Sequence, residues 1–185
     1  MTILGVDPGY AKCGWSVVER RTARVVALGV IVTTQDKTLD LSTDRARRVG
    51  SVSADLAAIA KAHRVSTIAA EQALGHGAAA AVAANMLPWG ALVMLAVMLD
   101  IPLVEVRAKT WQHAVLNLEV GKVDYAVVEA RLCAYVGPLL DLVKKSDRTH
   151  AVDGAGIGML AALRPHLTTR IVERQALHVK RKDAP

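Results

Sequence analysis

One stretch near the amino terminus decides the fold, and it reads Ile3-Leu4-Gly5-Val6-Asp7-Pro8-Gly9. A short apolar run followed by Pro-Gly predicts a buried strand that ends at a turn. Asp7 would be the last residue of that strand, so rigid backbone would hold its carboxylate at the edge of a sheet. The glycine two residues later lets another backbone or a ligand approach closely. The stretch therefore predicts a first strand and a candidate site residue together.

The chain that follows predicts a mixed sheet covered by helices. Two more apolar stretches, 14–19 and 24–33, would form an antiparallel meander with the first strand. Further predicted strands are 65–70 and 103–106, and predicted helices are 42–62, 77–99, 109–116, 123–135 and 153–163. We therefore expect an α/β fold with a mixed five-stranded sheet, antiparallel meander first and parallel strands after it, and helices on both faces.

Length, charge and cysteine content suggest one basic domain and a partner that is a polyanion. The chain has 185 residues, is 52% hydrophobic and carries a formal net charge of +6. From residue 164 onward six basic residues stand against two acidic ones, so we expect one folded domain over residues 1–165 and a basic tail over residues 166–185. That tail could contact phosphates or simply aid solubility. Cys13 and Cys133 lie far apart, which argues against a disulfide scaffold or zinc ribbon and favours a cytoplasmic protein.

The long uncharged segment between Glu71 and Asp100 is the one stretch with the length of a membrane span. Its first half is mostly alanine, and Asn85, Pro88 and Gly90 interrupt its middle. We therefore expect a buried central helix and no membrane contact.

Acidic residues follow two of the predicted strands and open the last helix. Glu71 ends an apolar strand as Asp7 does, and His150 and Asp153 are three residues apart, a spacing that places both on one helix face. Alone, each has a structural explanation, as a solvent-facing strand end, a cap or a helix N-terminal acid. Together they predict a divalent-metal site that prefers Mg²⁺ and tolerates Mn²⁺. Two such ions can activate water and stabilise the leaving 3′-oxygen in phosphodiester hydrolysis.

Three motifs carry a resemblance to a known family. They are residues 3–9 with Gly14, then Ala70-Glu71-Gln72, then His150-Ala151-Val152-Asp153 followed by Gly154-Ala155-Gly156-Ile157. In order and spacing, over residues 3–163, they resemble the RuvC Holliday-junction resolvases of the RNase H-like superfamily. The resemblance implies an RNase H-like fold and a homodimer with one Mg²⁺-dependent site per subunit. It also implies paired symmetric nicks in a four-way DNA junction.

Carried over residue by residue, the resemblance makes Asp7, Glu71, His150 and Asp153 the metal ligands. His150 could alternatively accept a proton from the attacking water. Lys109 and Lys122 resemble the family's two lysines near the scissile phosphate and the DNA backbone, and Arg107 lies in the same basic region. Each of these cations could also be a plain surface side chain.

The loop after Glu71 departs from the family pattern. There the family often has an aromatic residue that inserts at the junction centre, whereas this chain reads Ala73-Leu74-Gly75-His76-Gly77. Leu74 or His76 could take that place. Two other functions stay open: an RNase H-fold nuclease acting on RNA–DNA hybrid or flap DNA, and a non-catalytic junction-binding protein. The sequence does not tell whether branch-migration partners act with the chain.

Overall fold

A computed structural model describes residues 1–71, 79–107, 110–118 and 124–172, with the backbone alone for 79–85. Its centre is a six-stranded sheet of order β3-β2-β1-β4-β5-β6. The strands are β1 Thr2–Asp7, β2 Lys12–Glu19, β3 Val25–Val32, β4 Val65–Glu71, β5 Leu103–Val106 and β6 Thr169–Val172. Strands β1, β2 and β3 form the predicted antiparallel meander, and β4 and β5 run parallel to β1. The predicted α/β class with its meander and parallel strands is therefore confirmed.

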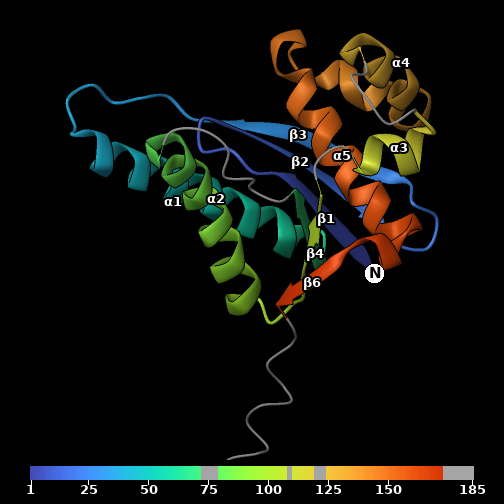
Figure 1. Ribbon diagram of the computed structural model, residues 1–185, viewed down its shortest axis with the longest axis horizontal. Coiled ribbons are helices and arrows are strands. Elements are labelled where there is room, and N and C mark those ends of the chain that lie inside the picture. Colours follow the sequence, from blue (N-terminus) through green and yellow to red (C-terminus); the bar gives the residue numbers. More distant parts are fainter. Residues whose placement is uncertain (72–78, 108–109, 119–123, 173–185) are drawn as a thin grey trace, which may run out of the picture.

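Helices cover both faces of the sheet (Figure 1). The first two, α1 Leu41–Ala62 and α2 Ala79–Met98, lie on one face. The other face carries α3 Thr110–Leu116, α4 Tyr125–Val136 and α5 Arg148–Leu163. Three short 3₁₀ helices complete the described elements: η1 Gly137–Leu142, η2 Lys145–Asp147 and η3 Pro165–Leu167.

Strand alternation divides the interior into two apolar cores and fixes which way the strand-end acids point. Leu4 and Val6 of β1 pack with α1 and α2, while Ile3 packs in the core that contains α5. Strand β4 alternates in the same way, with Ala69 on the α5 side. Because successive side chains of a strand point to opposite faces, Asp7 and Glu71 both belong to the face that α5 covers.

The sheet has one strand more than the sequence predicted. β6 pairs antiparallel with β5 and lies within residues 166–185, which we expected to form a basic tail. The turn and charge pattern around Arg164 hid this strand, because a four-residue strand carries too little periodicity to be recognised. The sheet therefore continues at least to Val172.

We expected α2 to be buried on all sides, but one of its sides is exposed. Leu92, Leu95 and Ala96 lie in the core, but Met94 and Met98 are 58% and 78% exposed. No helix in the described ranges combines the length and hydropathy needed to cross a membrane. Helix α2 is thus amphipathic in its packing although nearly all of its residues are apolar.

Candidate catalytic site

Glycines allow α5 to lie almost on the sheet beside Asp7. A Cβ built on Gly14 would lie 3.0 Å from the Cα of His150 and closer still to the carbonyl group of the same residue. On β1, a Cβ on Gly5 would collide with the backbone of Gly154 and Gly158. Side chains at these strand positions would hold the helix away, so the glycines set the distance between the strand-end acids and α5.

Helix α5 begins at Arg148, five residues before the predicted start at residue 153. His150 and Asp153 therefore both belong to the helix, three residues apart and on one side of it. The side chain of His150 reaches across to β1, where its Nδ1 lies 2.8 Å from Oδ2 of Asp7. This contact joins residues 143 positions apart in the chain and brings the first and last motifs together.

The hydrogen bond to Asp7 is the main reason why the pKa of His150 is raised. The charges of Asp7 and Asp153 act in the same direction, whereas partial burial and the charge of Lys12 oppose them. Nδ1 contacts Asp7, so Nε2 is the ring nitrogen that could serve as a ligand or as a proton acceptor.

Asp153 is a carboxylate of the site whose pKa is strongly raised. Burial, and after it the negative charges of Asp7 and Glu71, raise the pKa of this carboxyl to about 8. The Tyr125 hydroxyl lies 3.3 Å from Oδ1 of Asp153 and opposes the rise as a donor, although its shorter contact, 2.6 Å, is with the carbonyl oxygen of Thr149. Because the charges of Asp7 and Glu71 both raise the pKa of Asp153, the three carboxylates share one electrostatic environment.

The donor chemistry of this site fits a hard divalent cation. Three carboxylates and an imidazole are oxygen and nitrogen donors of the kind that Mg²⁺ and Mn²⁺ accept. Burial and the charges of Asp7 and Glu71 disfavour the ionised form of Asp153, and a bound cation would favour it. Within the described ranges, no three His, Cys, Asp or Glu side chains are already close enough together to hold an ion. The site therefore fits a divalent cation in its donor types and its charge.

Two features of the site carried no sequence signal. Tyr125 lies in a predicted helix, but nothing in its surroundings indicates that it contacts Asp153. Lys12 pairs with Asp147 at 2.7 Å, Nζ to Oδ1, and so ties β2 to the residue immediately before α5. Only the three-dimensional packing of α5 against β2 brings these partners together.

The remaining predicted DNA contacts lie at or beyond the limits of the described residues. Arg107 follows β5 and is exposed. Leu74, His76, Lys109 and Lys122 lie outside the described residues.

Comparison with known proteins identifies the family. A family model described as crossover junction endodeoxyribonuclease RuvC matches residues 3–160. This chain belongs to the RuvC family. The predicted family and the predicted activity, that of a crossover junction endodeoxyribonuclease, are therefore confirmed, and membership of the RuvC family implies dependence on a divalent metal.

Individual relatives agree with this placement. The crossover junction endodeoxyribonuclease RuvC of Mycobacterium leprae is 26% identical over 190 residues, which cover 100% of this chain and 93% of that protein. A solved Thermus thermophilus RuvC in complex with a Holliday junction substrate has a TM-score of 0.73 at 19% identity, covering 92% of this chain and 99% of that one. A second Thermus thermophilus RuvC structure gives 0.69 at 20% identity, covering 92% of this chain and 100% of the other. These likenesses confirm the RNase H-like fold of RuvC.

Proposed function

We propose that this RuvC family member resolves four-way (Holliday) DNA junctions by paired symmetric nicks. The observation that carries the proposal is the contact between His150 of α5 and Asp7 of β1, in the shared electrostatic environment of Asp153 and Glu71. A solved RuvC of the same fold is in complex with a Holliday junction substrate. The net charge of +6 favours a polyanionic substrate.

Asp7, Glu71, His150 and Asp153 are the residues that would hold two Mg²⁺ ions, with Mn²⁺ able to substitute. The chemistry that such ions supply when bound is activation of the attacking water and stabilisation of the leaving 3′-oxygen. The protein's own part is to fix the acids: β1 and β4 hold two of them at strand ends, and α5 brings the third with the imidazole. His150 also orients the Asp7 carboxylate through Nδ1 and keeps Nε2 available for a proton.

Arg107, Lys109 and Lys122 are proposed contacts of the DNA backbone, and Leu74 and His76 are proposed contacts at the junction centre. Exposure of Arg107 supports its part of this proposal. The cytoplasmic location stays a prediction.

Cleavage of synthetic DNA tests the function. With Mg²⁺ or Mn²⁺, the protein should cut a four-way junction into symmetric nicked duplexes and leave linear duplex intact. Asp7→Asn should retain binding and lose cleavage, because it removes a metal-binding charge with little change of shape. Equal cutting of RNA–DNA hybrid would favour the nuclease with another substrate, and binding without cutting would favour a junction-binding protein.

We further propose that a second copy of the chain covers the exposed side of α2. Leu87, Met94 and Met98 follow one another at spacings of seven and four along the helix, and all three are exposed. Exposed apolar patches are typical of protein interfaces, and these three side chains are the observation behind the proposal. Two nicks placed symmetrically also require two active sites, and a two-fold dimer supplies them.

Substitution on this row tests the dimer. Met94→Lys should convert the dimer to a monomer in light scattering, because it places a charge in the centre of the interface. The monomer should bind junctions more weakly and lose the coupling between the two nicks. Val127→Lys is the matched control, since Val127 is an exposed apolar residue on α4. A Met94→Lys protein that stays dimeric would contradict the placement of the interface on α2.

A further inference from the structure

A buried ion pair on α1 has no part in the chemistry described above. The side chains of Asp44 and Arg48 belong to residues that are 1% and 9% exposed, and Arg48 Nη1 lies 3.5 Å from Asp44 Oδ2. Burying two charges costs free energy even when they are paired. Around the pair, Arg47 donates to Oδ1 of Asp44 at 2.7 Å and the backbone N–H of Asp36 donates to the same oxygen at 3.0 Å. So many contacts fix Asp44, and through it the position of Arg48.

Arg48 in turn holds Tyr10. Its guanidinium carbon lies 4.7 Å from the centre of the Tyr10 ring, within the range of a cation–π contact. Arg48 Nε also donates to the hydroxyl oxygen of Thr33 at 2.7 Å, and the Thr33 hydroxyl donates to the carbonyl oxygen of Tyr10. Both the ring and the backbone of Tyr10 are therefore fixed by the same chain of contacts.

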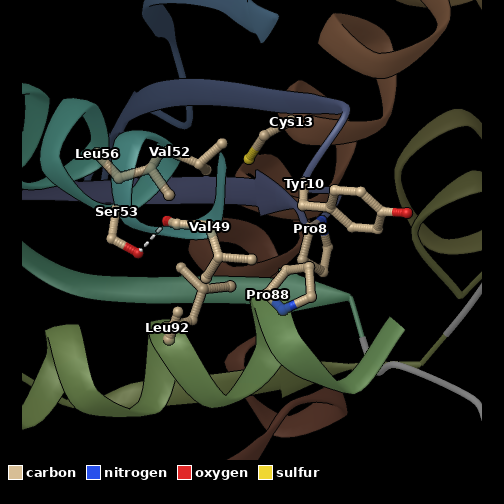
Figure 2. Close-up of a pocket in the computed structure, with 10 residues that line it drawn as sticks. Pro8, Tyr10, Cys13, Val49, Val52, Ser53, Leu56, Pro88 and Leu92 are labelled. Atoms are coloured by element: carbon tan, nitrogen blue, oxygen red, sulfur yellow. Dashed lines mark hydrogen bonds between the residues drawn. The ribbon is translucent and has the colours of Figure 1, made fainter. Parts of the chain in front are cut away.

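Tyr10 lies at the catalytic end of the sheet. It is three residues after Asp7, in the turn between β1 and β2. Together with Pro8 and Pro88 it lines a small apolar pocket between this turn, α1 and α2. Figure 2 shows the Tyr10 hydroxyl pointing away from the other side chains of the pocket.

This orientation decides which group Tyr10 offers to a ligand. Arg48 covers one face of the ring, so the ring is not free to stack between bases. The part of this half-buried residue that points away from the pocket is the phenolic O–H, a neutral hydrogen-bond donor. In protein–DNA complexes half or more of the hydrogen bonds go to phosphate and sugar oxygens, and such bonds set the register of the protein on the strand.

We propose that the Tyr10 hydroxyl donates a hydrogen bond to a phosphate of the cleaved DNA strand beside the phosphate that reacts at Asp7, with Asp44 and Arg48 as its positioning residues. The inference rests on the proposed function, because it takes DNA as the substrate and Asp7 as part of the catalytic site. Its role is to fix the register of the strand on the site. It predicts a contact with one phosphate and no dependence on base identity.

A double-mutant cycle tests the contact, with one change in the protein and one in the DNA. Tyr10→Phe keeps the ring and its contact with Arg48 and removes only the hydroxyl. It is combined with junctions that carry one uncharged methylphosphonate, placed in turn at each position near the cleavage site. Loss of a hydrogen bond to a charged group should lower kcat/KM by about 10- to 100-fold. At one phosphate position the modified junction should cost the wild type activity but cost Tyr10→Phe little more.

The outcomes separate this inference from the proposed function. The substrate is decided by comparing how fast the wild-type protein cleaves an unmodified junction and an unmodified linear duplex. The double-mutant cycle then uses whichever DNA the protein cleaves. Tyr135→Phe is the matched control, because Tyr135 of α4 is 56% exposed and should show no coupling at any position. The contact would be ruled out if Tyr10→Phe cleaved as fast as the wild type. It would also be ruled out if removal of the hydroxyl and modification of the phosphate lowered kcat/KM independently at every position.

A second variant tests the positioning residues. The combined change Asp44→Asn and Arg48→Met removes both charges at once and leaves no buried charge unpaired. The Tm of this double variant shows whether it still folds as the wild type does. In the folded double variant, Tyr10→Phe should lower kcat/KM less than it does in the wild type, because Arg48 no longer holds the ring. An undiminished effect would remove Asp44 and Arg48 from the proposal.

Discussion

Gly14→Ala should separate α5 from the sheet and disable the site. The new methyl group would lie 3.0 Å from the Cα of His150 and closer to the carbonyl group of that residue, and none of these atoms belongs to a flexible side chain. Helix α5 would have to move outward by on the order of 1 Å, because close-packed interiors leave no void to absorb a methyl group. The hydrogen bond of 2.8 Å between His150 and Asp7 would then be stretched towards breaking.

The loss of stability in Gly14→Ala follows from overpacking between β2 and α5, and the loss of cleavage follows from displacement of His150. Overpacking a core costs about 1–3 kcal/mol, and in a protein of this length each kcal/mol lowers the Tm by about 2–4 °C. A displacement of about 1 Å at a reacting group can cost roughly 100-fold in rate. Junction cleavage under single-turnover conditions and thermal unfolding should therefore both respond, and cleavage should respond far more strongly than stability predicts.

The control is a glycine of a helix, whereas Gly14 lies on strand β2. A Cβ on Gly50 of α1 would meet nothing within 4 Å, so Gly50→Ala should raise stability by about 0.5–1 kcal/mol and leave cleavage unchanged. If Gly14→Ala cleaved junctions at the wild-type rate, the close approach of α5 to the sheet would not be what sets the geometry of the site.

Three further outcomes are expected. In metal-free protein the raised pKa of Asp153, about 8, contributes stability below pH 4 that is lost as the pH rises towards 8, so Asp153→Asn should flatten the fall of Tm with pH over that range. The pKa of Asp147 is lowered, chiefly by Lys12, so Asp147→Asn should lower the Tm at pH 7 and have little effect at pH 2. Deletion of residues 173–185, which retains β6, should give DNA binding a shallower dependence on salt, whereas an unchanged slope would exclude phosphate contacts by the tail.

Much of the framework was predictable because it depends on local patterns. The stretch at residues 3–9 predicted β1 and its turn, and alternation within strands then places Asp7 on one particular face. The spacing of His150 and Asp153 predicted that they share a helix side. Each of these predictions needs only the periods of strand and helix, which a single sequence displays directly.

What could not be predicted depends on packing between distant segments. The apolar composition of α2 is nearly uniform, so no periodicity shows that Leu95 faces the core while Met94 faces outward. Strand β6 is short and is defined only by its pairing with β5. The contact of Tyr125 with Asp153 arises because α4 packs against α5, and nothing near Tyr125 in the sequence encodes that neighbour.

The acidic site opposes the stability of the fold that carries it. Glycines let α5 approach the sheet, and this approach buries Asp153 near Asp7 and Glu71, where its charge is disfavoured. A structure selected for stability alone would place no third acid there, since an apolar residue would pack without the electrostatic cost. A residue that lowers stability with no gain in packing is a candidate for a functional role, and Asp153 is such a residue. A bound cation removes this conflict because it stabilises the ionised carboxylates together. Metal binding should therefore release a proton from Asp153 and raise the Tm more at pH 8 than at pH 6.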